Sequence, residues 1–493
     1  PESRWRVLLK ILFGVLMAAG SAAAQESGAA TRPAFGERPN VLFISTDDLN
    51  IDLGCYGRPW ARTPNLDRLA EQGVRFDLTY CQYPLCNPSR VSMLTGLRPD
   101  TTRVYDLATN FRTTVPDAVT LPQLFRQNGY YTARVGKIFH YGVPRQIGTP
   151  GMDDPISWDF TFNPLGRDKI EEDRLHILTR GTGTNTIGFA MAWLSMDGTD
   201  EEQTDGIGVA QTVRLLEEVA RERRPFFIGM GFYRPHTPFV ATHRWFDAHP
   251  LESVKLHTRP ADDLDDVPDI ALHIRPPDYG LDEGGLRDCM RGYRAAVSCL
   301  DAQVGILLDT LDRLGLAENT IVVFFSDNGF LLGQHGQWQK QLLFDESARV
   351  PLIIRVPGMG GKGPCLRPVE LLDVYPTLVE LCRLPAPPQQ LEGRSLVPFL
   401  RDPATPSDRP AFSQVTRNVG RGEQRRRIMG YSVRTQRWRY TEWGPDGRRG
   451  RELYDHETDP GEFRNLAEDP AHRETVEQLR GLLQQVRRYR PAT

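Results

Sequence analysis

Two pairs of polar residues follow predicted buried strands and could hold a metal ion. Asp47 and Asp48 come directly after one apolar run, and Asp327 and Asn328 follow another. The carboxyl ends of parallel strands meet at one edge of an α/β sheet, where ligand-binding groups gather. Either pair alone would fit turn or helix-cap chemistry equally well, but together they offer four oxygen donors to a hard divalent cation. We expect one Ca²⁺ here, with Mg²⁺ as the alternative. Zinc is disfavoured because few thiolate or imidazole groups lie nearby.

Further residues stand in short motifs that could bind an anion and transfer protons to and from it. The segment 86–96 fits the pattern C-x-P-S-R-x-x-x-x-T-G, in which the arginine follows the cysteine by one helical turn. Taken singly, a cysteine is usually buried or bridged, and a lysine or histidine is usually a surface or core residue. The ordered set is what points to chemistry, and the other histidines, such as His335, are expected to be structural. The candidate catalytic residues are Cys86, Arg90, Lys137, His140, His236 and Lys340.

Alternating strands and helices are expected to position these residues. Continuous apolar runs at 40–46, 226–231 and 321–325 are typical of central parallel strands buried on both faces. A further strand is expected at 131–135. Helical patterns occupy 63–73 (with Thr63 as N-cap), 121–128, 209–223 and 286–314. This alternation predicts an α/β fold, a sheet sandwiched by helices.

The residue patterns at the two ends of the chain differ from the strand–helix alternation of its middle. Basic residues, an apolar run and Ala22-Ala23-Ala24 make 1–24 a predicted secretory signal peptide, with an uncleaved anchor as the alternative. We treat 25–38 as a linker and 39–400 as the catalytic domain. Short strands at 428–433 and 438–443 and a last helix at 473–488 predict a smaller C-terminal α+β subdomain at 410–493. The protein is therefore expected to be exported to a periplasmic, extracellular or lysosome-like compartment.

The composition of the chain limits the classes of binding partner and the disulfides that we expect. With 493 residues, 60 basic and 63 acidic, the chain has a net charge of −3 and can bury a large core without disulfides. We therefore expect neither nucleic acid nor a membrane as a stable partner. Seven cysteines leave at least one thiol unpaired. Cys289 and Cys299 share one predicted helix and lie about 15 Å apart, too far for a disulfide. The pairs Cys55–Cys81 and Cys365–Cys382 stay open.

The segment 86–96 resembles the signature of the type I sulfatases, whose cysteine a maturase oxidises to formylglycine. The elements G-K-x-x-H at 136–140, P-H-x-P at 235–238 and the lysine at 340 resemble further motifs of that family. The resemblance implies an alkaline-phosphatase-like sheet with a small C-terminal sheet domain. It also implies a metal held by Asp47, Asp48, Asp327, Asn328 and the modified Cys86, together with formylglycine made from Cys86.

The same resemblance implies a role for each candidate residue. A hydrated aldehyde on residue 86 would attack the sulfur, and Arg90 would hold it and help to neutralise the sulfate. Lys137 and Lys340 would contact sulfate oxygens, and Lys340 would also contact the leaving oxygen. His140 would remove a proton to expel sulfate, and His236 would protonate the departing alcohol.

Segments around 98–106, 298–305 and 429–435 are similar to the iduronate-2-sulfatase branch of the family. This similarity implies a sulfated glycan as the substrate, cleaved at a terminal 2-O-sulfated uronic acid. Asn328, Phe330 and Gln341 depart from that branch near the expected site and leave the sugar open. Arg103, Arg434 and Arg437 are candidate partners for a uronate carboxylate. The arginine-rich stretch 417–439 is expected to be either a polyanion-binding surface or a solvated basic face.

Three alternatives accompany this interpretation. The first is a sulfatase for another sulfated sugar, and the second is a phosphodiesterase or phosphonate hydrolase that uses the same metal and nucleophile. The third is a silent glycan-binding protein, which requires Cys86 to remain a thiol.

Overall fold

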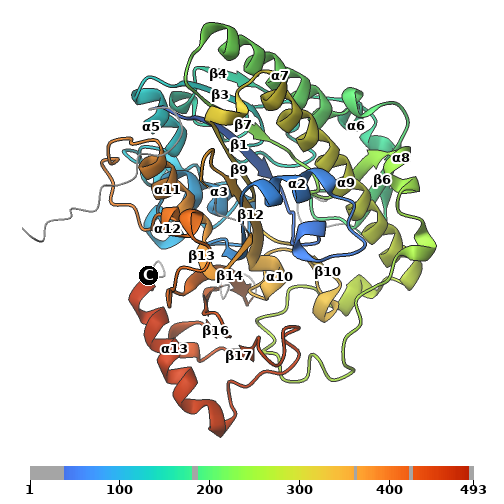
Figure 1. The fold of residues 1–493 in the computed structure, drawn as a ribbon. Helices are drawn as coiled ribbons and strands as arrows, with labels where there is room; N and C mark the ends of the chain where they lie inside the picture. The colour runs from blue at the N-terminus through green and yellow to red at the C-terminus, as the bar shows by residue number, and fades with distance from the viewer. Residues whose placement is uncertain (1–37, 180–186, 360–362, 421–425, 488–493) are drawn as a thin grey trace, which may run out of the picture. The chain divides into compact units, whose positions relative to one another are not determined.

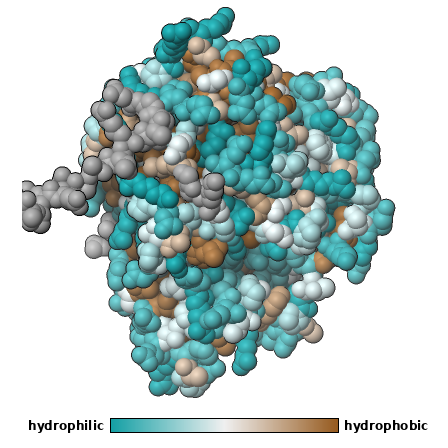
Figure 2. Space-filling model, in the orientation of Figure 1, coloured by the Kyte–Doolittle hydropathy of each residue, from teal (hydrophilic) through white to brown (hydrophobic). Residues whose placement is uncertain are grey.

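The computed structural model describes residues 38–179, 187–359, 363–420 and 426–487. The predicted signal peptide and all but the last residue of the linker lie outside these residues. Among the described helices, none combines the length and apolar character needed to cross a membrane. The face shown in Figure 2 is mostly hydrophilic, with small separate hydrophobic areas, as is usual for a protein surface.

An eight-stranded mixed sheet forms the centre of the molecule. Its strand order is β13-β2-β12-β9-β1-β7-β3-β4, and β12 alone runs antiparallel to its neighbours. The predicted central strands are confirmed, because β1 pairs in parallel with both β7 and β9. The strands are β1 (Asn40–Thr46), β2 (Val74–Tyr80), β3 (Tyr131–Gly136), β4 (Phe160–Phe162), β7 (Phe226–Gly231), β9 (Thr320–Ser326), β12 (Arg349–Arg355) and β13 (Gly363–Glu370).

Helices cover both faces of this sheet (Figure 1). Successive side chains of β1 point to opposite faces, so Val41 and Phe43 pack in one core while Leu42 and Ile44 pack in the other. The first core includes α3 (Cys86–Thr95), α5 (Leu121–Gln127), α11 (Val374–Leu381) and α12 (Val397–Arg401); the second includes α2 (Pro64–Gln72), α7 (Thr204–Glu222) and α9 (Glu283–Arg313). The shorter helices are α4 (Pro99–Thr102), α6 (Arg167–Ile170), α8 (His243–Asp247) and α10 (Asp345–Ala348). The predicted sandwich is therefore confirmed.

A second, antiparallel sheet follows near the C-terminus. Its order is β14 (Ala411–Val419), β15 (Arg426–Arg434), β16 (Trp438–Trp443) and β17 (Arg451–Asp455), and α13 (Arg473–Val486) packs against it. Smaller sheets are formed by β10 (Leu331–Leu332) with β11 (Trp338–Gln339), and by β5 (His176–Ile177), β6 (Ala192–Met196) and β8 (Phe239–Thr242). The predicted helix at 209–223 begins earlier, at Thr204. Thr63 occupies the N-cap position of α2 without capping it, because its hydroxyl bonds Asp67 and the Gly54 amide.

Neither open disulfide pair forms, and all seven cysteines are free thiols. The Cys55 carbonyl accepts a hydrogen bond from Arg75 near the start of β2, whereas Cys81 follows the end of that strand. Arg75 and Cys81 are six residues, or about 20 Å, apart along β2, so Cys55 lies near the opposite end of this strand from Cys81. Cys382 lies next to Tyr130 as a free thiol and is not bridged to Cys365.

Three arginines of the arginine-rich stretch form ion pairs in the fold, namely Arg434, Arg437 and Arg439, whereas Arg426 and Arg427 are exposed. The partners of these three are Asp345, Asp455 and Glu462 respectively. These pairs tie the strands of the C-terminal sheet to neighbouring segments. Arg434 and Arg437 therefore already have carboxylate partners within the fold. Arg421 and Arg425 lie outside the described residues.

One buried histidine contributes to this packing. The His335 ring is fully buried, stacks on Phe344 with a centroid distance of 4.1 Å, and its Nδ1 lies 2.9 Å from an Asp263 carboxylate oxygen. Burial would lower the pKa of His335, but the hydrogen bond to Asp263 and the charge of Glu346 outweigh burial and raise it. The structural role expected for His335 is consistent with these contacts.

This pair makes the free energy of unfolding depend on pH. Because the folded-state pKa of His335 lies above its unfolded value of about 6.5, the ion pair stabilises the fold fully below that pH. The contribution should disappear as pH rises through the folded pKa. We expect the difference in unfolding free energy between wild type and His335→Asn, measured by urea denaturation, to shrink from pH 6 to pH 9. Asparagine tolerates the positive φ of 55° at this position. The exposed His243→Asn is the control, and a difference that grows with pH would contradict the assignment.

Candidate active site

The turn after β1 carries the first two candidate ligands. Asp48 adopts a left-handed conformation with φ of 64°, which costs a non-glycine residue about 1 kcal/mol. The Tyr293 hydroxyl of α9 holds this turn by donating to the Asp48 carbonyl (3.0 Å) and accepting from the Asn50 amide (2.9 Å). Asp47 and Asp48 are both fully buried. The turn therefore points two carboxylates into the interior at the carboxyl edge of the sheet.

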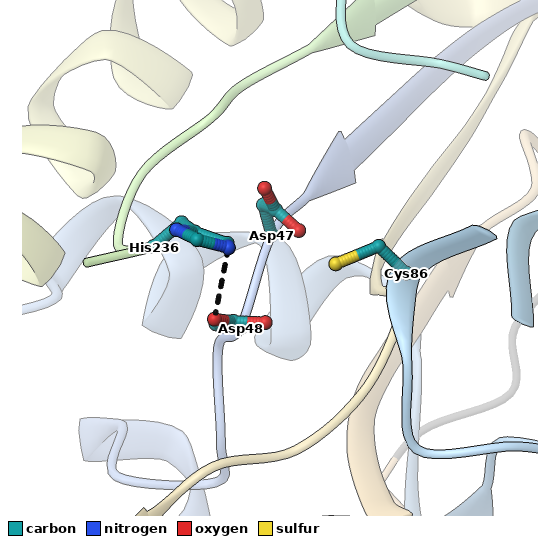
Figure 3. A group of neighbouring side chains, drawn as sticks. All are labelled: Asp47, Asp48, Cys86 and His236. Atoms are coloured by element: carbon teal, nitrogen blue, oxygen red, sulfur yellow. Dashed lines mark ion pairs between the residues drawn. The ribbon is translucent and has the colours of Figure 1, made fainter. Parts of the chain in front are cut away.

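Cys86 is the first residue of α3 and faces those carboxylates (Figure 3). Its sulfur lies 3.0 Å from the Lys340 ammonium and is almost completely buried. Burial, reinforced by the charge of Asp47, raises the pKa of the Cys86 thiol. The unmodified side chain is therefore a neutral thiol and a poor nucleophile near neutral pH.

The Arg90 guanidinium ties four segments of the site together. Its Nε donates to the Asp327 carboxylate at 2.7 Å, Nη1 donates to the Ser45 hydroxyl and to the carbonyls of Lys137 and Ile138, and Nη2 donates to the Thr46 carbonyl. Arg90 is fully buried, one turn along α3 from Cys86 as predicted. Its donors are directed at protein groups, so its position fixes the ends of β1, β3 and β9 relative to α3. Contact between Arg90 and a sulfate remains a prediction.

Two lysines neutralise the aspartates. The Lys137 ammonium pairs with Asp47, and the Lys340 ammonium lies 2.5 Å from an Asp48 oxygen. Burial disfavours the charged form of Lys340, but attraction to Asp48 outweighs it and raises the pKa. Burial also works against the Asp47 carboxylate, and Lys137, followed by other cations, more than compensates, which holds the pKa of Asp47 well below its usual range.

A close backbone approach positions Lys137. Gly136 has φ of 71°, and a Cβ there would lie 2.1 Å from the Gly231 carbonyl oxygen. A Cβ on Gly231 would in turn lie 2.1 Å from the Lys137 carbonyl oxygen. Only glycine at both positions lets the ends of β3 and β7 come this close, which brings Lys137 and His236 to the same edge of the sheet.

Both predicted histidines line this edge and are buried. His236 Nε2 lies 3.6 Å from an Asp48 oxygen (Figure 3), while His140 Nδ1 has no hydrogen-bond partner among the described residues. Burial, followed by the charge of Lys137, lowers the pKa of His140 well below its usual value. Burial and then the charge of Lys340 lower the pKa of His236 to about 4. Both rings are therefore neutral at pH 7, the form that accepts a proton.

The acidic cluster fits a divalent cation. Asp47 Oδ1, Asp48 Oδ2 and Asn328 Oδ1 are buried without hydrogen-bond partners among the described residues. Burial raises the pKa of Asp327 to about 7, and repulsion from Asp47 and Asp48 adds to this against the opposing charge of Arg90. A bound cation would satisfy the free oxygens and relieve that repulsion. Asp47, Asp48, Cys86 and His236 each place a ligand atom within 4.8 Å of the others. Asp327 instead bonds Arg90 and the Asp48 amide.

Phe330 and Gln341 also depart from the iduronate-2-sulfatase branch, and the structure shows where their side chains lie. Phe330 is fully buried and stacks on Tyr293 at 5.6 Å. It belongs to the core beneath the Asp48 turn, so the expectation that Phe330 retunes the sugar site is not supported by its position. Gln341 is partly exposed, and its backbone amide donates to the Pro84 carbonyl at 2.9 Å. Gln341 therefore stays beside the segment that leads to Cys86.

The sequence did not reveal the residues that support His236. The adjacent Arg234 is buried and pairs with Asp205 at 2.9 Å and Asp168 at 3.3 Å, while the Tyr233 hydroxyl also bonds Asp168. These contacts anchor the loop after β7 to α6 and α7. Asp205 lies in the first turn of α7, where an acidic residue is common and indicates no special role. Only the fold shows that Arg234 meets carboxylates 29 and 66 residues away in the chain.

Arg90 should be the most costly of the buried cations to remove. Its loss leaves Asp327 and nearby carbonyls buried without partners, so we expect Arg90→Met to lower the unfolding free energy by about 3–5 kcal/mol in chelator-treated protein. Urea denaturation measures this. The exposed pair Arg68–Asp309 provides the control, and Arg68→Met should cost at most about 1 kcal/mol. Equal effects of the two substitutions would show that Arg90 does not organise the site.

Comparison with known proteins places this geometry in a family. A family model described as Sulfatase matches residues 39–383, and one described as N-sulphoglucosamine sulphohydrolase, C-terminal, matches residues 333–489. The chain is 33% identical to iduronate 2-sulfatase of Mus musculus, over 97% of this chain and 99% of that protein. It is 31% identical to choline-sulfatase of Rhizobium meliloti, over 88% of this chain and 83% of that protein.

A solved structure shares the fold. The phosphonate monoester hydrolase of Agrobacterium radiobacter superposes with a TM-score of 0.72 at 24% identity, covering 91% of this chain and 95% of that chain. At this identity the likeness concerns the fold alone. The family match and the two relatives confirm the resemblance drawn from the motifs, and the chain belongs to the sulfatase family, whose members hydrolyse sulfate esters.

Proposed function

We propose that this sulfatase removes the 2-O-sulfate of a terminal uronic acid in a sulfated glycan, using formylglycine made from Cys86 and one Ca²⁺. The observation that carries the proposal is the position of Cys86, buried between the Lys340 ammonium and the Asp47–Asp48 carboxylates at the start of α3. A maturase supplies the modification, and the N-terminal segment directs export. Formylglycine, once formed and hydrated, supplies an oxygen nucleophile that the thiol of Cys86 does not offer.

Asp47, Asp48, Asp327 and Asn328 would hold the cation together with the modified residue 86. The donors are oxygens, which favours Ca²⁺ and, as the alternative, Mg²⁺. The ion supplies Lewis acidity at the reacting oxygens. Its two positive charges would also balance the aspartates that Lys137 and Lys340 now neutralise. Both ammonium groups would then be free to face a sulfate.

Four side chains of the chain would act on the sulfate ester. Lys137 and Lys340 bind and orient its oxygens and compensate its charge. His140 is neutral at pH 7, as a residue that accepts a proton during sulfate release must be. His236 is neutral as well, and the negative charge of a bound sulfate would favour its protonated form, which is needed to donate to the leaving alcohol.

Support for the sugar comes from the relative that matches almost the whole chain, which is named iduronate 2-sulfatase. The similar identity to a choline-sulfatase shows that the family accepts quite different esters at this level of likeness. Arg103 is exposed, and Arg434 and Arg437 are engaged elsewhere in the fold. The substrate therefore has to be decided by comparing esters directly.

The metal assignment predicts one Ca²⁺ per chain. Calorimetric titration of the chelator-treated protein should show a single Ca²⁺ site that binds Mg²⁺ more weakly. Asp48→Asn removes the negative charge from a side chain whose Oδ2 has no hydrogen-bond partner among the described residues. This substitution should weaken Ca²⁺ binding at least tenfold. Asp301→Asn, which changes a buried carboxylate that bonds Asn65 and Leu66 far from this edge, is the control. Unchanged Ca²⁺ affinity in Asp48→Asn would refute the site, and tighter Mg²⁺ binding would favour the alternative ion.

The two histidines should fail at different stages of one turnover. Loss of a proton-transfer group typically costs about 10²–10⁴ in rate. In rapid-mixing experiments with an aryl sulfate, His140→Ala should release one equivalent of the phenol in a burst and then stall, because sulfate release is slowed. His236→Ala should show no burst, because departure of the alcohol is itself impaired. Identical time courses for the two variants would show that this division of roles is wrong.

A substrate panel tests the function itself. The fully modified, Ca²⁺-loaded enzyme should prefer a 2-O-sulfated uronate disaccharide over a 6-O-sulfated hexosamine and an aryl sulfate in kcat/KM. An aryl phosphate diester and a phosphonate monoester should be poor substrates. A preference for the hexosamine above about tenfold, or ~1.4 kcal/mol in the transition state, would leave a sulfatase of different specificity. A preference for the phosphonate would favour the hydrolase alternative.

A further inference from the structure

Arg417 on β14 is a buried cation that forms no ion pair with any carboxylate in the described part of the chain. Its side chain is only 8% exposed, and its Nε has no hydrogen-bond partner among the described residues. Its other contacts are weak, with backbone carbonyls of Thr416 at 3.3 Å and Ala271 at 3.5 Å and with the Trp443 ring at 5.2 Å. Burying a charge without a counter-charge is costly, so the position calls for an explanation.

The rest of the C-terminal sheet shows what a structural arginine looks like here. Arg434 and Arg439 are buried to a similar degree, and each pairs with a carboxylate. The acid that acts on Arg417, Glu452, forms no ion pair with it within the described segments and instead accepts from Trp443 and Tyr454. Burial accordingly lowers the pKa of Arg417 to about 10. Arg417 is thus a buried guanidinium that a ligand anion could satisfy.

The imidazole of His273 stands near Arg417 and is exposed at the surface. The chain packed around it, followed by the charge of Arg417, lowers the pKa of His273 to about 4, so the ring is neutral at pH 7 and offers an anion a hydrogen bond but no charge. The Gln337 side-chain oxygen accepts from the amides of His273 and Ile274, at 2.9 Å and 2.8 Å. This anchor holds the segment that carries His273 in place next to Arg417, whose guanidinium donates to the Ala271 carbonyl of the same segment.

Two anchors connect this place to the candidate active site. The Tyr83 hydroxyl bonds the Thr416 hydroxyl (2.7 Å) and amide (2.9 Å), immediately beside Arg417. Tyr83 precedes Cys86 by three residues, and Gln337 precedes Lys340 by three, so each anchor is within about 10 Å of a candidate catalytic residue along the chain. The segments that carry Cys86 and Lys340 are thus hydrogen-bonded to the segments that carry Arg417 and His273, which is the arrangement that a glycan reaching from Cys86 to Arg417 requires.

We propose that Arg417, with His273 at its side, forms an anion subsite that binds a second negatively charged group of the glycan, either the uronate carboxylate or an additional sulfate. The inference rests on the proposed glycan substrate and deepens it. A guanidinium can donate two parallel hydrogen bonds to a carboxylate or to a sulfate. The subsite would add affinity for charged glycans and leave simple sulfate esters unaffected.

The test combines stability and kinetics in the modified, Ca²⁺-loaded enzyme. Arg417→Met removes the charge and keeps the length, Arg417→Lys keeps the charge, and Arg437→Met is the matched control from a surface ion pair of the same sheet. Without ligand, Arg417→Met should unfold at the same temperature as wild type or higher, because a buried unpaired charge is lost. A disaccharide with a 2-O-sulfated uronate and an N-sulfated hexosamine should lose at least tenfold in kcat/KM, mainly through KM. Aryl sulfate hydrolysis should change less than twofold, and Arg417→Lys should recover part of the loss.

Two modified disaccharides identify the group that is bound. Wild type and Arg417→Met should act equally on the carboxyl-reduced disaccharide if the carboxylate occupies the subsite, or on the N-acetylated one if the second sulfate does. A drop of aryl sulfate activity in parallel with glycan activity, a lowered unfolding temperature, or no loss on the charged disaccharide would overturn the proposal. If the enzyme desulfates no glycan, the proposed function fails, and the subsite is judged by binding alone. The intact disaccharide should then raise the unfolding temperature of wild type and of Arg437→Met but not of Arg417→Met.

Discussion

The structure depends on one electrostatic constraint, the burial of three aspartates at the carboxyl edge of a parallel sheet. Asp47, Asp48 and Asp327 are withdrawn from water, and isolated carboxylates do not remain charged in such surroundings. Arg90, Lys137 and Lys340 compensate them through direct ion pairs. The segments that supply these cations are α3, the end of β3 and the segment after β11, so the charge balance fixes how these elements meet. Gly136 and Gly231 make the approach of β3 to β7 sterically feasible.

The same balance accounts for the chemistry that we propose. Lys137 and Lys340, which pair with the carboxylates, are well placed to neutralise a sulfate once a divalent cation balances the carboxylates. The free oxygens of Asp47, Asp48 and Asn328 are what this exchange requires. Burial, followed by the positive charge of Lys137 and Lys340, also keeps His140 and His236 neutral. An incoming anion would therefore change the protonation of the site as well as its charge.

Much of this could be predicted from the sequence, because its strongest signals are local. Continuous apolar runs marked β1, β7 and β9, and polar residues directly after them marked the edge where Asp47, His236 and Asp327 meet. The motif at 86–96 placed Cys86 and Arg90 one turn apart on a helix. What the sequence could not reveal are pairings between distant segments. Arg234 with Asp168 and Asp205, and Tyr293 beneath the Asp48 turn, became visible only with the fold. The same holds for the arginine-rich stretch, because charge in a sequence does not show that Arg439 pairs with Glu462 while Arg417 pairs with no acid among the described residues.

The measurement that tests the central claim most directly is the mass of the proteolytic peptide that contains residue 86, taken from active enzyme produced in a host with a maturase. Our account predicts an aldehyde or its hydrate in place of the thiol. It also predicts that activity scales with the modified fraction across preparations with different maturase levels. Fully active enzyme that carries only the unmodified Cys86 thiol would contradict the account.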